Sequence, residues 1–355
     1  MNMRGKNIPP HVMAAVLLGL SLSAGTYPQG TADASPGLKS GVVFTEYSPL
    51  SRSAELARRT LSPLANLALT RALGASSLRD QGIDLARETF SVYVPARRPA
   101  QGFGLLVFIP PWQDSRLPAG WASLLDEVGV IFVSAAKSGN EENVLGRRIP
   151  LALLAAANIK QRYAIDEQRI YIAGFSGGSR IALRTALSYP DLFRGAILNA
   201  GSDPIGGQET LLPTEDMFNR FQESSRVVYV TGDSDEVNLK NDMGSRESMN
   251  HWCVFGTAVE PMSGRGHEVA PPQFLRRALE ALDKPASSID DGGKLSACRN
   301  QIRAELAEDL QRVRELLDRN KSGAAQRALT KLDVRYGGLA APASLELWRR
   351  IAPPQ

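Results

Sequence analysis

The sequence predicts an α/β fold with a mainly parallel sheet that is covered by helices on both faces. Continuous apolar runs, such as residues 103–109 and 130–135, are typical of parallel strands buried on both sides. Helical patterns alternate with these runs between residues 88 and 283. Residues 169–184 read as a strand, a glycine-rich turn and a helix. Functional residues are therefore expected in the loops beyond the C-terminal ends of the strands.

The expected elements follow in chain order. Residues 25–40, rich in Gly, Ser, Ala and Pro, read as a flexible lead-in. Within an N-terminal extension (residues 25–87) we expect a strand at 42–44 and a helix at 54–73, interrupted near Pro63. In the α/β domain (residues 88–283) we expect strands at 89–94, 103–109, 130–135, 169–173, 196–199 and 227–231, a strand-like stretch at 258–262, and helices at 121–128, 147–163, 176–188 and 271–282.

The composition changes after residue 283. A polar linker (residues 284–293) leads to helical patterns at 295–318, 324–332 and 343–351, which we call the appendage. Its apolar face is expected to dock on the main domain or to pack within the helical hairpin. Binding of a protein partner, or a lid over the substrate, are the alternatives.

The overall charge is modest. The 355 residues carry a formal net charge of +4, and the Lys and Arg residues are scattered rather than clustered. No nucleic-acid partner is therefore expected.

The N-terminus has the pattern of a signal peptide. Arg4 and Lys6 precede an apolar run at residues 12–22, and small residues end at Ala24. We expect residues 1–24 to be removed and the protein to be exported to the periplasm or outside the cell. A membrane anchor is the alternative, but the run is too short to span a bilayer comfortably.

Ser176 is the candidate nucleophile. It lies in Gly174-Phe-Ser-Gly-Gly178, where the glycines allow a strand and a helix to approach closely around a strained turn. A phosphate-binding turn is the alternative, but neither Gly-x-Gly-x-x-Gly nor a Walker lysine accompanies it.

A serine nucleophile requires a histidine base and an acid that orients it. The chain has three histidines, and His11 lies in the signal peptide. His267 lies in a glycine-rich loop before the last helix of the domain, whereas His251 follows a helical stretch and reads as a packed or surface residue. Asp235 follows the strand at 227–231 and is the candidate acid, with Asp233 as the alternative. Acidic residues that merely end a turn are also common there.

The oxyanion of the transition state needs two N–H donors. Gly177, which follows the nucleophile, is expected to supply one, and the loop after residues 103–109 the other. That loop begins Pro110-Pro111, and proline has no N–H, so Trp112 or Gln113 would have to donate. Both residues could line the substrate site, and Trp112 could instead be an ordinary packed tryptophan.

The only cysteines are Cys253 and Cys298. An oxidising compartment would permit a disulfide between them, and two free thiols are the alternative.

Gly-Phe-Ser-Gly-Gly-Ser, the late Gly-Asp-Ser-Asp and the Gly-His-Glu before the last helix together resemble the α/β-hydrolase superfamily. Residues 166–171 and 189–196 resemble secreted esterases related to polyhydroxyalkanoate depolymerases and to feruloyl or acetylxylan esterases. The resemblance implies a Ser-His-Asp esterase without metal or other cofactor, acting on small or polymeric esters through Ser176, His267 and Asp235. Two departures are the missing His-Gly oxyanion motif and the low cysteine count. One alternative is a peptidase on the same fold. The other is an inactive, hydrolase-like binding protein whose partner binds at the appendage.

Overall fold

Eight strands form one sheet in the computed structural model, which describes residues 35–73, 81–285 and 293–351. Their order is β1-β2-β4-β3-β5-β6-β7-β8. The first two strands in this order pair antiparallel to their neighbours, and all the others are parallel. The strands are β1 (Gly37–Val42), β2 (Phe90–Val94), β3 (Phe103–Ile109), β4 (Val130–Ala135), β5 (Ile165–Phe175), β6 (Gly195–Asn199), β7 (Arg226–Val230) and β8 (Thr257–Val259). The predicted mainly parallel sheet is confirmed.

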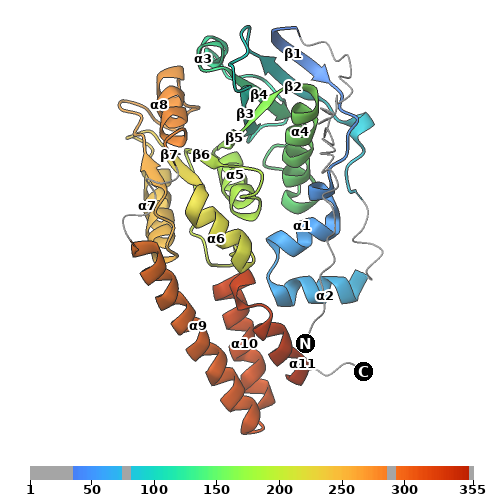
Figure 1. The fold of residues 1–355 in the computed structure, drawn as a ribbon, viewed down its shortest axis with the longest axis vertical. Helices are drawn as coiled ribbons and strands as arrows, with labels where there is room; N and C mark the ends of the chain where they lie inside the picture. The colour runs from blue at the N-terminus through green and yellow to red at the C-terminus, as the bar shows by residue number, and fades with distance from the viewer. Residues whose placement is uncertain (1–34, 74–80, 286–292, 352–355) are drawn as a thin grey trace, which may run out of the picture. The chain divides into compact units, whose positions relative to one another are not determined.

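Helices cover both faces of this sheet (Figure 1). Those of the N-terminal and central parts of the chain are α1 (Ser53–Thr60), α2 (Pro63–Leu73), α3 (Trp121–Val128), α4 (Ile149–Arg162), α5 (Gly177–Ser188), α6 (Glu215–Ser224), α7 (Glu236–His251) and α8 (Pro272–Leu282). One apolar cluster joins the sheet to α4 and α5, and a second joins its other face to α3 and α8. Every residue of β2, β3 and β4 is buried, including the polar Ser91 and Ser134, because both faces of the sheet are covered here.

The register of the central strands brings their C-terminal ends together. Ile109 at the end of β3 pairs with Gly174 on β5, and Phe175 pairs with Asn199 on β6. Asn199 also ties this edge to a distant loop, because its Nδ2 donates to the Val230 carbonyl (2.9 Å) and its Oδ1 accepts from the N–H of Ala270 (2.7 Å). The loops that follow β3, β4, β5 and β7 therefore begin at one edge of the sheet.

Several elements differ from the sequence-based expectation. β1 occupies residues 37–42 instead of 42–44, within part of the expected flexible lead-in, because it pairs antiparallel with β2. Helix α6 was not among the expected elements, α7 is the helical stretch expected before His251, and β8 ends before residue 262. The helix at 54–73 divides into α1 and α2 around Pro63, as expected. The signal-peptide prediction (residues 1–24) and residues 25–34 lie outside the described residues.

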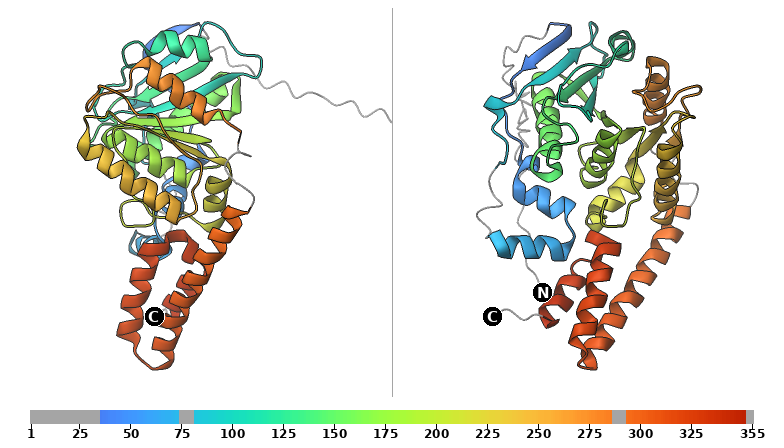
Figure 2. Two further views of the ribbon diagram at one scale, coloured as in Figure 1. Left: turned by 90° about the vertical axis from the view of Figure 1, so that its left-hand side faces the viewer. Right: turned by 180° about the vertical axis from the view of Figure 1, so that it is seen from behind.

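The appendage consists of α9 (Lys294–Asp318), α10 (Ser322–Tyr336) and α11 (Ala343–Ile351). Figure 2 shows α9 and α10 side by side, and α11 also contacts α2. The buried residues Leu310, Val313 and Leu329 belong to the same apolar cluster as α4 and α5. The apolar face therefore packs both within the hairpin and on the main domain, the two arrangements that the sequence left open.

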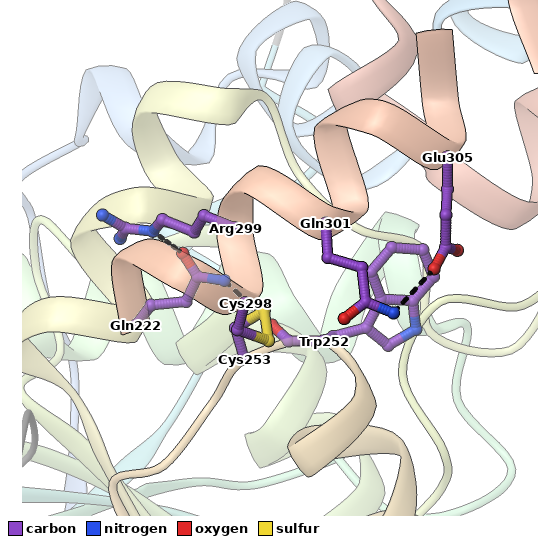
Figure 3. The surroundings of a disulfide bond; sticks show 7 residues. All are labelled: Gln222, Trp252, Cys253, Cys298, Arg299, Gln301 and Glu305. Atoms are coloured by element: carbon purple, nitrogen blue, oxygen red, sulfur yellow. Dashed lines mark hydrogen bonds between the residues drawn. A yellow bond between two sulfur atoms is a disulfide. The ribbon is translucent and has the colours of Figure 1, made fainter. Parts of the chain in front are cut away.

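A disulfide joins the appendage to the main domain. Cys253, which follows α7, and Cys298, in the second turn of α9, are bonded, with their Cα atoms 5.8 Å apart. Figure 3 shows Gln222 of α6 beside this bond, where it accepts a hydrogen bond from Arg299 Nε (2.6 Å) and donates one to the Trp252 carbonyl (2.8 Å). The start of α9 is thus fixed by one covalent bond and a short polar network.

None of the helices within the described ranges combines the length and the apolar character that crossing a membrane requires.

Candidate active site

Ser176 lies at the sharp turn between β5 and α5. Its backbone has φ 54° and ψ −120°, a conformation that non-glycine residues rarely adopt. The turn is anchored because the Ser176 N–H donates to the Asn199 carbonyl on β6 (2.8 Å). The side chain is thereby held above the edge where the strands end, at the N-terminus of α5.

The two glycines that flank Ser176 allow this turn to form. A Cβ atom on Gly174 would come within 2.3 Å of the Gly178 backbone, and one on Gly178 within 1.9 Å of the Ile109 carbonyl oxygen. Any side chain at either position would push α5 away from the sheet. The close approach predicted from the Gly-x-Ser-x-Gly spacing is confirmed.

The structure brings His267 into contact with Ser176. The imidazole Nε2 lies 3.0 Å from Ser176 Oγ, and the ring stacks at a tilt on Phe175, with the ring centres 4.9 Å apart. His267 belongs to the loop that Asn199 holds through Ala270. The hydrogen-bonded pair has the geometry in which an imidazole can accept the proton of a serine hydroxyl.

Asp235 lies on the opposite side of the imidazole. Its Oδ2 is 2.7 Å from His267 Nδ1, and the carboxylate is buried at the N-cap of α7. Burial acts to raise the pKa of this carboxyl, but the hydrogen bonds from His267 and Asn238 outweigh it and hold the pKa below its ordinary value. Asp235 is therefore held as a carboxylate that can fix the orientation of the ring.

Asn238, one turn into α7, is a contact of this site that the sequence analysis missed. Its Nδ2 lies 3.0 and 2.9 Å from the two oxygens of Asp235 and 3.1 Å from His267 Nδ1. Its Oδ1 accepts from Arg180 of α5 (3.4 Å), and Arg180 also pairs with Asp203 (3.0 Å). The position three residues after an N-cap aspartate was the available signal, because such side chains lie close together on a helix.

The alternative candidates Asp233 and His251 lie outside the contact chain, by which we mean the hydrogen-bonded line from Ser176 through His267 to Asp235. Asp233 is exposed, and its carboxylate accepts hydrogen bonds from the N–H of Gly264 (3.1 and 2.9 Å), which shapes the loop before His267. His251 is exposed at the end of α7, and its ring lies edge-on to Trp252. Neither side chain lies in the hydrogen-bonded line from Ser176 to Asp235.

The candidate oxyanion residues lie around the start of α5. Gly177 is the first residue of that helix, so its N–H belongs to the group that has no partner inside the helix. Trp112 is partly buried and packs on Phe175, with a ring distance of 6.1 Å, and on Phe108. Within the described residues, the Trp112 indole Nε1 is buried without a hydrogen-bond partner. Gln113 is exposed.

No group of three or more His, Cys, Asp and Glu side chains able to hold a metal ion occurs in the described part of the chain.

Similarity to known proteins is found among solved structures. It matches no family model, and no curated protein sequence matches it. Among solved structures it is similar to an acetyl xylan esterase from Aspergillus awamori, with 16% identity over 55% of this chain and 94% of that chain and a TM-score of 0.43. It is also similar to Est1E from Butyrivibrio proteoclasticus, with 16% identity over 57% of this chain and 98% of that chain and a TM-score of 0.41. A third similar structure is dipeptidyl peptidase 4 from Porphyromonas gingivalis, with 16% identity over 55% of this chain and 33% of that chain and a TM-score of 0.41. At this level of similarity the matches carry no argument about activity.

Proposed function

We propose that this chain is an exported serine hydrolase that cleaves carboxylic esters through an acyl-enzyme intermediate. The observation that carries the proposal is the line of hydrogen bonds from Asp235 through His267 to Ser176, with contacts of 2.7 and 3.0 Å. A nucleophile, a base and an orienting acid in this arrangement are the apparatus of acyl transfer. Their order in the chain, Ser, Asp, His, is the order found on α/β-hydrolase folds.

The residues divide the reaction between them. Ser176 Oγ attacks the ester carbonyl while His267 Nε2 accepts its proton, and the carboxylate of Asp235 stabilises the imidazolium that forms. The imidazolium then donates the proton to the leaving alcohol. Water attacks the acyl-enzyme with His267 again as base, and the acid is released with Ser176 restored.

The negative charge that develops on the carbonyl oxygen needs stabilisation. We propose that the N–H of Gly177, at the first position of α5, donates a hydrogen bond to this oxygen. The dipole of the 12-residue helix adds to the stabilisation. The sequence-based expectation that Trp112 or Gln113 supplies a second donor remains a prediction.

Export is part of the proposal. The apolar segment after Arg4 and Lys6 has the pattern of a signal peptide, and a structural disulfide such as Cys253–Cys298 persists in oxidising compartments. The pattern and the bond support a periplasmic or extracellular location.

The test labels the mature protein with a fluorophosphonate and locates the labelled peptide by mass spectrometry. We expect label on Ser176 that is lost in Ser176→Ala, nearly lost in His267→Ala and retained in His251→Ala, which serves as the matched control. A folded protein that takes no label would contradict the proposal and favour a binding function.

Hydrolysis assays then separate esters from amides. We expect turnover of short acyl esters by the wild-type protein, and none by Ser176→Ala. Cleavage of peptides in preference to esters would instead identify a peptidase with the same three residues.

A further inference from the structure

The loop that should complete the oxyanion site lacks two of its backbone donors. It follows β3 and begins with Pro110 and Pro111, neither of which has an N–H. Their carbonyl groups are occupied as acceptors: that of Pro110 binds Arg148 (3.0 Å), and that of Pro111 binds the N–H of Asn140 (3.0 Å). A donor from another part of the chain would resolve this deficit.

The loop that follows β4 lies directly against this proline loop. Besides the Asn140–Pro111 bond, the N–H of Lys137 donates to the Gln113 carbonyl (2.6 Å). A Cβ atom on Gly139 would lie 2.8 Å from the Trp112 carbonyl carbon, so the two backbones are in close contact. The β4 loop is thus placed where it can add a group to the site.

Arg148 holds the β3 and β4 loops together through hydrogen bonds. Its side chain is 3% exposed, and it donates to the Ser138 carbonyl on the β4 loop (2.9 Å) and to the Pro110 carbonyl on the β3 loop (3.0 Å). Its burial, together with the nearby Arg184, lowers its pKa to about 10, so the guanidinium is still charged at neutral pH. Charge-assisted bonds to both carbonyls make the arrangement of the loops rigid.

The carboxamide of Asn140 reaches the residue that follows the nucleophile. A Cβ atom on Gly177 would lie 2.2 Å from Asn140 Oδ1 and 3.0 Å from Nδ2, so the carboxamide occupies the space that a side chain at 177 would fill. Asn140 is exposed, and within the described residues its carboxamide has no hydrogen-bond partner. A half-turn about χ2 exchanges the oxygen and the nitrogen, so the NH₂ group can take the position beside Gly177.

We propose that the Asn140 side-chain amide is the second donor to the oxyanion, opposite the N–H of Gly177. This inference rests on the proposed hydrolase function. In this arrangement the β4 loop, fixed by Arg148, supplies the donor that Pro110 and Pro111 cannot, in place of the alternative donors Trp112 and Gln113. A side-chain amide is suited to this role because it is neutral and points one N–H at the developing charge.

The test compares the kcat and KM of ester hydrolysis for wild type, Asn140→Ala, Asn140→Asp and Glu141→Ala. Removing one oxyanion donor typically lowers kcat about 100- to 1,000-fold, so we expect this loss for Asn140→Ala, with KM changed only a few-fold. Asn140→Asp keeps the shape and removes the donor, and should lose at least as much. Glu141→Ala, an exposed neighbour on the same loop, should match wild type.

The outcomes distinguish the two proposals. Wild-type hydrolysis that depends on Ser176, together with wild-type kcat in folded Asn140→Ala or Asn140→Asp, would overturn the role of Asn140 alone. A wild-type protein that neither hydrolyses esters nor takes fluorophosphonate would overturn the proposed function, and this inference with it.

A pair of variants separates donation from packing. Gly177→Ala should collide with Asn140, and the added Asn140→Gly change should relieve the collision. We expect the double variant to regain thermal stability but to keep a kcat about 100-fold below wild type. Recovery of the full kcat would show that Asn140 only fills space.

Discussion

The α/β domain and the appendage are held together by different means. The strands of the domain share one continuous ladder, and both of their faces are covered by apolar side chains. The appendage is joined to the rest of the chain by an apolar seam and by separate contacts. These include the Cys253–Cys298 bond, the hydrogen bond from Arg299 to Gln222 (2.6 Å), and the buried Asp333, which accepts from Ser62 Oγ and the N–H of Leu64 (3.2 Å) in the N-terminal extension. A register shift would disrupt the domain throughout, whereas the appendage can lose one contact at a time.

This difference suggests a division of roles. The proposed catalytic side chains lie on loops of the domain, and none lies on α9, α10 or α11. Changes near Ser176 should therefore alter turnover more than stability, and changes at the seam of the appendage should do the reverse. The four predictions below test this division, from the largest expected effect to the smallest.

Replacing Asp235, the acid that orients the base His267, should give the largest effect on kcat. Asp235→Asn keeps the shape but removes the charge that fixes the tautomer of His267, so we expect kcat to fall about 10,000-fold while the melting temperature changes little. Asp233→Asn, two residues away and outside the contact chain, is the matched control and should keep most of the activity. Equal losses in the two variants would contradict the assignment of Asp235.

The disulfide should matter for stability alone. The bond closes a segment with a sequence separation of 45, and loss of such a bridge typically lowers the free energy of unfolding by about 2 to 5 kcal/mol. We expect this change in denaturant unfolding of the Cys253→Ala/Cys298→Ala protein, with kcat near wild type. A fall in kcat when the disulfide is removed would show that the appendage supports the active site. It would contradict the division of roles between the domain and the appendage.

Asn238 should act through the acid. Asn238→Ala removes a donor to Asp235, so we expect a roughly tenfold loss of kcat and a raised Asp235 pKa. The stabilisation from a lowered carboxyl pKa is present above its unfolded value, 3.8, and is lost as pH falls through the folded value. This loss should therefore be smaller and be complete at a higher pH in the variant, as measured by unfolding across acidic pH. Asn250→Ala, exposed on the same helix, should leave both quantities unchanged.

Asp333 should give the smallest effect, at the seam of the appendage. Burial raises its pKa despite hydrogen bonds from Ser62 and Leu64. A raised carboxyl pKa contributes stability below the unfolded value of 3.8 that is lost as pH rises through the folded value. We expect the wild type to lose stability relative to Asp333→Asn as pH rises to neutrality, by about 1 kcal/mol or less. A stability difference between the two proteins that stays constant with pH would contradict this prediction.

Local patterns predicted the domain well. The strand at 103–109 and the helix at 121–128 have the expected bounds, because an apolar run and a helical period are each decided by neighbouring residues. The Gly-x-Ser-x-Gly spacing predicted the turn for the same reason. The structure also joins Ser176, Asp235 and His267, three residues that the sequence could select by type and chain order.

Long-range contacts were beyond the sequence analysis. β1 forms because β2 lies beside it, and nothing within residues 37–42 alone shows this partner. The contacts of Asn238 with Asp235, and of Asn140 with Gly177, depend on how loops meet after folding. A polar residue in a loop has no periodicity that could mark it, so these two positions required the structure.

The position of the disulfide has a consequence for a chain that is cut. His267 and the polar stretch before α9 both lie between Cys253 and Cys298. A protease that cleaves one peptide bond in this interval would produce two polypeptides that are still joined through sulfur. Such a protein would migrate as one band on a gel without reductant and as two bands with it, so the molecule would persist in a two-chain form for as long as the bond stayed oxidised.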